Sequence, residues 1–134
     1  MNLRALLICE DVRLESDGTL TLVGVHNDRL RSRAPNGPLI LEHLSFLVVI
    51  GGLTGVERIG FRERVRHVED GSPAEQPLKH ELHDPRTDEH NFVFGHAPMV
   101  FPEYGTYEVI VEVKVAKKTA TYRHRFGIER VGFD

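Results

Sequence analysis

Cysteines and long apolar runs are both scarce in this sequence. Cys9 is the one cysteine among 134 residues, which excludes an internal disulfide framework and a structural zinc site built from cysteines. The longest apolar stretch, Leu44 to Leu53, has about ten residues, half of the roughly 20 that a membrane-spanning helix requires. The apolar N-terminus leads directly into Glu10 and Asp11 without a small-residue cleavage site. We therefore interpret it as a strand, and expect a cytoplasmic protein with no membrane contact.

Charge of either sign is in only slight excess. The 17 basic and 20 acidic side chains give a formal net charge of −3, with an isoelectric point near 6.2. Dedicated nucleic-acid binders usually have an isoelectric point above roughly 9, so the composition argues against a nucleic-acid partner but leaves a local basic patch open. With 40% hydrophobic residues, the length suits a single domain covering residues 1–134.

Strand patterns dominate what the sequence does contain. Val, Ile, Phe, Tyr and Thr recur in short segments, which are separated by clusters of Gly, Pro, Asn and Asp. Seven or eight strands in one small domain predict an all-β sandwich or barrel. The expected strands cover residues 3–13, 19–27, 39–51, 57–69, 78–83, 91–96, 106–115 and 119–129.

The last two expected strands, 106–115 and 119–129, alternate most regularly between apolar and polar residues. A turn centred on Lys117-Lys118 brings their apolar faces together and sets Glu112 opposite Arg123 on the polar face. Two lysines suit a two-residue hairpin turn poorly, since that turn prefers Asn-Gly. We therefore expect a four-residue loop with the same register.

One expected strand, 57–69, interrupts its own alternation. Ile59 and Phe61 lie on an apolar face opposite a row of arginines, and Glu63 falls on the same apolar face. A bulge near Gly60 or a local ion pair accounts for this charge among apolar residues.

Arginines form the main candidate binding surface. Arg62, Arg64 and Arg66 alternate along one expected strand, and Arg123 and Arg125 along another. If these strands are neighbours, the five side chains form a basic stripe suited to phosphate or carboxylate groups. The alternative is a solvated face on which the arginines pair with glutamates across the strands. No aromatic residue lies among them to stack on bases.

Histidines gather in the second half of the chain, at His80, His83, His90 and His96. Histidine is a common ligand of divalent metals, but His80 and His83 are three residues apart, whereas ligands on one face of a strand are two apart. The spacing favours a solvated polar loop. Binding of a small ligand or a divalent metal in the region 80–96 is the alternative.

The sequence contains no group of residues that we expect to act together in catalysis. It has neither a G-x-S-x-G nor an H-E-x-x-H motif. Glu10 and Asp11 are adjacent on an expected strand and so point to opposite faces. Cys9 lies in an apolar strand, where burial raises the pKa of a thiol and weakens it as a nucleophile. We expect no enzymatic activity and no cofactor.

Several segments resemble a family of small bacterial proteins of about this length, which is catalogued as a domain of unknown function. The resemblance covers nearly the whole chain and implies a β-sandwich of immunoglobulin-like type with seven to eight strands; it brings no activity, cofactor or site residue. The segments that carry it are Ile8-Cys9-Glu10-Asp11-Val12-Arg13, the run from Gly18 to Val25, the run from Phe101 to Val109, and Tyr122 to Phe126. Within them, Tyr107 at the start of a strand resembles the tyrosine corner of sandwich domains.

These observations lead us to expect a non-enzymatic binding or accessory module that acts through protein–protein contacts. Ile110 on the polar face and the strand 78–83 are the expected contact points. A homodimer paired through a sheet edge is one form that such contacts can take.

Overall fold

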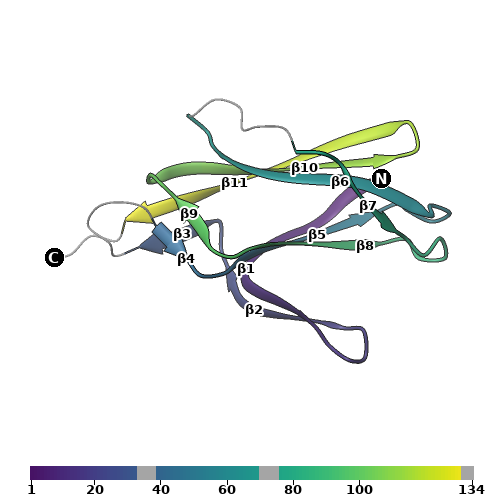
Figure 1. The fold of residues 1–134 in the computed structure, drawn as a ribbon, viewed down its shortest axis with the longest axis horizontal. Coiled ribbons are helices and arrows are strands. Elements are labelled where there is room, and N and C mark those ends of the chain that lie inside the picture. Colours follow the sequence, from purple (N-terminus) through teal and green to yellow (C-terminus); the bar gives the residue numbers. More distant parts are fainter. Residues whose placement is uncertain (33–38, 70–75, 131–134) are drawn as a thin grey trace.

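The computed structural model describes residues 1–32, 39–69 and 76–130, and within these ranges it contains strands and no helix (Figure 1). None of the described residues forms a helix that is long and apolar enough to span a membrane. The predicted all-β class is therefore confirmed. The strands are β1 (Asn2–Leu14), β2 (Leu20–His26), β3 (Arg29–Ser32), β4 (Leu39–Leu41), β5 (Leu44–Gly51), β6 (Arg58–His67), β7 (Lys79–Leu82), β8 (His90–His96), β9 (Met99–Phe101), β10 (Gly105–Val115) and β11 (Lys118–Arg130).

These strands form two larger sheets and a small one. Sheet A has the order β2-β1-β5-β8, and all its pairs are antiparallel. Sheet B has the order β3-β11-β10-β6-β7, and only its β3–β11 pair is parallel. The short strands β4 and β9 pair with each other. As expected, the strand within 78–83 lies at a sheet edge, since β7 is the last strand of sheet B.

The expected number of seven to eight strands is wrong, because the described residues form eleven. The expected strand over 39–51 is divided by Glu42 and His43, so β4 pairs with β9 while β5 joins sheet A. Two further strands, β3 and β9, correspond to no expected strand, and they have only four and three residues. Such short strands give alternation too little length to be recognised.

The core lies between sheets A and B. Phe46 of β5 packs against Phe126 of β11, with ring centroids 5.9 Å apart, and Phe61 of β6 packs against Phe92 of β8 at 5.0 Å. Both pairs join one sheet to the other. In Figure 1, β10, β11 and β6 accordingly form one layer, and β5 and β8 lie below it.

The charge on the apolar face of β6 has a partner across the core. Glu63 is almost fully buried, and its carboxylate lies 3.0 Å from Nε2 of His96 on β8. The pairing of β6 with β10 runs without interruption from Gly60 to His67, so no bulge is present there. Of the two explanations that the alternation left open, the ion pair is the correct one.

The hairpin of β10 and β11 differs from its prediction by two residues. Val115 pairs with Lys118, so the loop is the two residues Ala116 and Lys117, and Ala116 has a φ of 52°. A shift of two residues leaves every side chain on its expected face, because strand side chains alternate with a period of two. The register therefore cannot be read from alternation alone, and Glu112 faces Thr121 instead of the predicted Arg123.

Candidate functional site

The five predicted arginines come together on the outer face of sheet B. The residues Arg62, Arg64 and Arg66 of β6 and Arg123 and Arg125 of β11 flank the central strand β10 from its two sides. Glu108 and Glu112 of β10 lie between the two rows. The predicted stripe is thus interrupted along its middle by carboxylates.

Glu108 is the centre of one half of this face, which we call the arginine face. Its carboxylate accepts hydrogen bonds from Arg66 at 3.2 Å, from Arg123 at 3.0 Å and from Arg125 at 3.4 Å. Burial acts to raise the pKa of Glu108, but the hydrogen bonds from Arg123, Arg66 and Arg125 outweigh it and hold this pKa below its ordinary value. Glu108 therefore stays ionised and serves three guanidinium groups at once.

Glu112 serves the other half of the arginine face. It accepts a hydrogen bond of 2.7 Å from Nε of Arg62 and lies 3.8 Å from Arg64. Two carboxylates thus neutralise part of the charge of five guanidinium groups. The solvated-face alternative describes the arrangement well, except that both arginines of β11 contact Glu108 and neither contacts Glu112.

Ile110 is not the exposed contact point that its position on the polar face suggests. Its exposed fraction is 1%, although it lies outside the core between the sheets. The pairing places it directly between Arg64 and Arg123, whose aliphatic stems flank it. The expectation that Ile110 is an exposed contact is therefore wrong.

The outer face of sheet A has the opposite character. On β5, on β8 and on β1 from Ala5 to Cys9, the residues of this face are all uncharged, and Arg4 lies over Gly51 at one end. Val25 of β2 and Val93 of β8 are 54% and 45% exposed, respectively. The residues that form this apolar face are Ala5, Leu7, Cys9, Val25, Ser45, Leu47, Val49, Asn91, Val93 and Gly95. Three of them, Cys9, Ser45 and Leu47, are already buried within the chain, and the other seven are partly or well exposed.

Charged residues border the apolar face without entering it. At one end, Arg4 donates hydrogen bonds to Asp88 at 2.5 Å and to Glu89 at 2.7 Å. At the other end, Arg13 donates to Asp11 at 3.3 Å. An apolar centre within a polar rim is the usual anatomy of a protein–protein interface.

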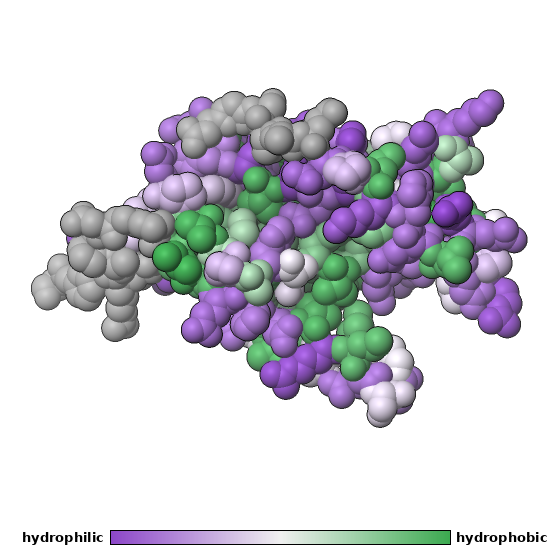
Figure 2. Space-filling view, viewed as in Figure 1, coloured by the Kyte–Doolittle hydropathy of each residue, from purple (hydrophilic) through white to green (hydrophobic). Residues whose placement is uncertain are grey.

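Sequence reasoning missed this apolar face, although the near-continuous apolar run of β5 contained the signal. Figure 2 shows hydrophobic residues reaching the surface on the lower side of the view, where β1 and β2 leave the body.

Of the four predicted histidines, the structure brings two together. His83 and His90 lie with their Nδ1 atoms 3.0 Å apart. His80 lies instead beside Gly60 on the outer face of sheet B, and His96 pairs with Glu63. Among residues 1–32, 39–69 and 76–130, no group of three or more His, Cys, Asp or Glu side chains converges as metal ligands do.

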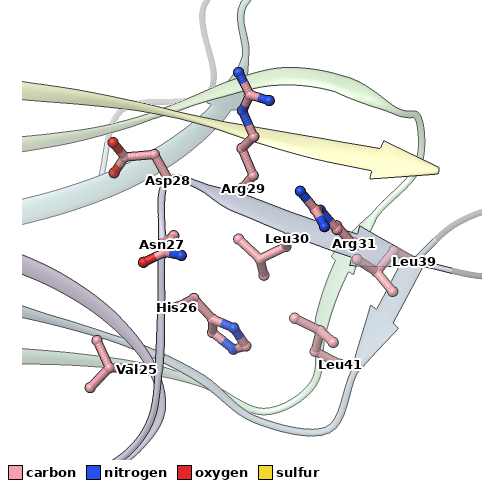
Figure 3. A pocket seen from close by; sticks show the side chains of 9 residues that line it. All are labelled: Val25, His26, Asn27, Asp28, Arg29, Leu30, Arg31, Leu39 and Leu41. Carbon is pink, nitrogen blue, oxygen red and sulfur yellow. The ribbon is translucent and has the colours of Figure 1, made fainter. Parts of the chain in front are cut away.

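A hollow lies where the chain crosses from β2 to β3 (Figure 3). Its volume is about 600 Å³, and it is open to solvent. Among the described residues that line it there is no Ser, Thr or Cys, and so no hydroxyl or thiol nucleophile. Beside it, His124 donates from Nε2 to Asp28 at 2.9 Å. The lining consists of Val25, His26, Asn27, Asp28, Arg29, Leu30, Arg31, Leu39 and Leu41.

Cys9 has the environment expected from its strand. It is fully buried, and its Sγ lies 3.6 Å from the carbonyl oxygen of Ser45, to which it donates a weak hydrogen bond. Burial, together with the negative charge of Asp11, raises the pKa of the thiol. A protonated, covered sulfur is a poor nucleophile.

Comparison with known proteins adds no family to this description. No protein-family model matches the chain, and no curated protein sequence matches it. The resemblance to a bacterial family stays a prediction from the residues quoted for it.

Proposed function

We propose that this protein is a non-enzymatic binding module that acts through protein–protein contacts, and that its contact surface is the apolar face of sheet A. A single observation carries the proposal: ten residues that share one sheet face include no charge, while charged pairs border that face. Contiguous apolar surface of this kind commonly marks a site of association.

The occupant that fits this surface is a second copy of the chain. Two sheets pack face to face at about 10 Å when each contributes an apolar face, and the second copy supplies the matching one. Each copy carries a formal charge of −3, yet an uncharged face brings no like charges together on contact. This arrangement replaces the edge-paired homodimer that the sequence suggested, because the apolar surface lies on a face and not along an edge.

The finer description of the fold belongs to the same proposal. We infer that sheets A and B form a β-sandwich of immunoglobulin-like type, as the resemblance to the bacterial family implies. Tyr107 supports this inference, since its buried ring lies against Phe101 and Phe126 and its hydroxyl donates to the carbonyl of Glu103 at 2.8 Å. A tyrosine hydroxyl bonded to backbone a few residues upstream characterises sandwich domains.

Analytical ultracentrifugation across a wide concentration range tests the proposed dimer. We expect the unaltered protein to dimerise and Val25→Lys with Val93→Lys to be monomeric, since two buried lysines would oppose association. Val100→Lys is the matched control, because Val100 is 46% exposed but lies on β9, away from the apolar face. A monomer at every concentration would refute the proposal. A dimer that dissociates on Leu82→Lys and not on the double change would refute it too, and would indicate pairing through the β7 edge.

A further inference from the structure

His83 and His90 meet at one end of the molecule, where the edge strands of the two sheets lie close together. His83 follows β7 of sheet B directly, and His90 begins β8 of sheet A. Backbone hydrogen bonds hold the connecting loop, among them His83 N to Glu57 O at 2.9 Å and Leu53 N to Asp88 O at 2.9 Å. The histidine pair therefore rests on an ordered frame.

The outer nitrogens of the two rings are both hydrogen-bond donors. Nε2 of His83 lies 2.9 Å from the carbonyl oxygen of Thr87, and Nε2 of His90 lies 2.6 Å from the carboxylate of Glu81. Because a carbonyl and an ionised carboxylate only accept, each Nε2 carries the hydrogen. With the hydrogen on Nε2, the Nδ1 atoms of the two rings are left to carry lone pairs, and they face each other across 3.0 Å.

Two facing lone pairs repel each other unless a cation, which can be a shared proton or a metal ion, lies between them. Histidines that bind metals almost always donate their other ring nitrogen to a carbonyl or a carboxylate, which orients the ring and raises its basicity. His83 and His90 both have such a partner. Two nitrogens bound to one tetrahedral zinc ion at about 2.0–2.1 Å lie roughly 3.3 Å from each other. The observed 3.0 Å is close to that separation.

We propose that Nδ1 of His83 and Nδ1 of His90 bind one divalent transition-metal ion of the zinc or nickel class. Imidazole ligands favour these ions over Mg²⁺ and Ca²⁺, which prefer oxygen. In the described part of the chain no third His, Cys, Asp or Glu joins the pair, so the two imidazoles are the ligands that these residues supply. The site does not depend on the proposed dimer.

The surroundings of the pair suit a bound cation. Glu81 contributes a carboxylate behind His90, whereas the carboxylate of Asp84, next to His83 in the chain, is already paired with Arg86 at 3.0 Å. The ring of Phe92 packs against His90 with centroids 4.6 Å apart, which provides an apolar wall on that side. His80 takes no part, because it lies on the outer face of sheet B.

Isothermal titration calorimetry with ZnCl₂ and NiCl₂ tests the site on the full chain. We expect one ion per chain for the unaltered protein and no stoichiometric binding for His90→Gln. Glu81→Gln leaves both ligands in place and is expected to weaken affinity about 10-fold or more, as loss of an outer hydrogen-bond partner does at known sites. His80→Gln is the matched control and is expected to bind as the unaltered protein does.

Far-ultraviolet circular dichroism establishes that each variant is folded before titration. His83 is left unchanged because it is 5% exposed and its replacement affects packing. If the unaltered protein shows no stoichiometric heat, the pair shares only a proton and the proposal is wrong. Equal weakening by His80→Gln and His90→Gln would also overturn it, because the ion would then bind elsewhere.

Discussion

The outer faces of sheets A and B are built from similar alternating strands, yet they carry opposite kinds of side chain. The arginine face sets five guanidinium groups around two carboxylates, whereas the apolar face carries no charge on β5, on β8 or on β1 from Ala5 to Cys9. The difference shows that a charged sheet face can pair much of its charge within one chain. An apolar face cannot do so, because removing it from water requires a second surface.

Two aliphatic residues make the contrast concrete. Ile110 lies in the middle of the arginine face and is 1% exposed, while Val93 lies on the apolar face and is 45% exposed. The arginines beside Ile110 are long enough to cover it with their stems. The neighbours of Val93 on its own face are short, so nothing of comparable reach covers it.

The largest effect on stability is expected at the centre of the arginine face. Glu108→Ala removes an almost fully buried carboxylate and leaves Arg66, Arg123 and Arg125 without their shared acceptor. Loss of one partner of a buried ion pair typically costs about 3 kcal/mol, and urea denaturation measures the change. Glu112→Ala should cost less, because Glu112 is 14% exposed and only Arg62 bonds it closely. Equal losses would contradict the central role of Glu108.

The ion pair between the sheets should make stability depend on pH. Glu63 raises the pKa of His96 above its ordinary value of 6.5 through a hydrogen bond, and this outweighs the effect of burial. The folded state therefore retains a proton that the unfolded state has already lost, so the contribution is full below pH 6.5 and disappears as pH rises through the higher folded pKa.

Urea denaturation between pH 5 and 9 checks this dependence, with His96→Gln as the comparison. We expect the stability of the unaltered protein to fall relative to that of the variant as pH rises through this window. Parallel pH profiles for the two proteins would show that the pair does not provide this stability.

A smaller effect is expected at the margin of the arginine face. Arg125 is 64% exposed and contacts Glu108 at 3.4 Å, while two other arginines hold the same carboxylate. Arg125→Ala should cost less than about 0.5 kcal/mol in chemical denaturation, as exposed ion pairs usually do. A loss comparable to that of Glu108→Ala would mean that the face acts as a single cooperative network.

The smallest effect on the stability of one chain is expected on the apolar face. Val93→Lys places an exposed charge where the side chain already meets water, so the monomer should change by less than about 0.5 kcal/mol. Denaturation at a concentration too low for dimers checks this, with Val100→Lys as the reference. A large loss would show that Val93 supports the fold itself, and the contrast between the two faces would then be wrong.

Prediction from the sequence succeeded where the alternation of side chains within a single strand was sufficient. Alternation placed Arg62, Arg64 and Arg66 on one face of β6, and it placed Glu63 on the other face as a charge that required a partner. It could not identify that partner, because His96 lies 33 residues away on the opposite sheet. The prediction that Ile110 is exposed was wrong for the same reason, since the burial of Ile110 depends on which strands flank β10.

The site residues divide in a similar way. The histidine cluster was visible in the sequence, but the spacing of His80 and His83 drew attention to the wrong pair, since His83 meets His90 across the ends of two strands. The short strands β3 and β9 were missed because three or four residues contain no recognisable period.

The amino-acid sequence by itself determined that this chain forms strands, and for the longer strands it determined which side chains share a face. Those properties follow from backbone geometry, which turns successive side chains to opposite sides whatever lies nearby. Only the tertiary structure decided which strands are neighbours, and with them the pairing of the arginines, the meeting of His83 with His90 and the exposure of the apolar face. Each of these depends on contacts between segments distant in the chain, and a period of two holds no information about them.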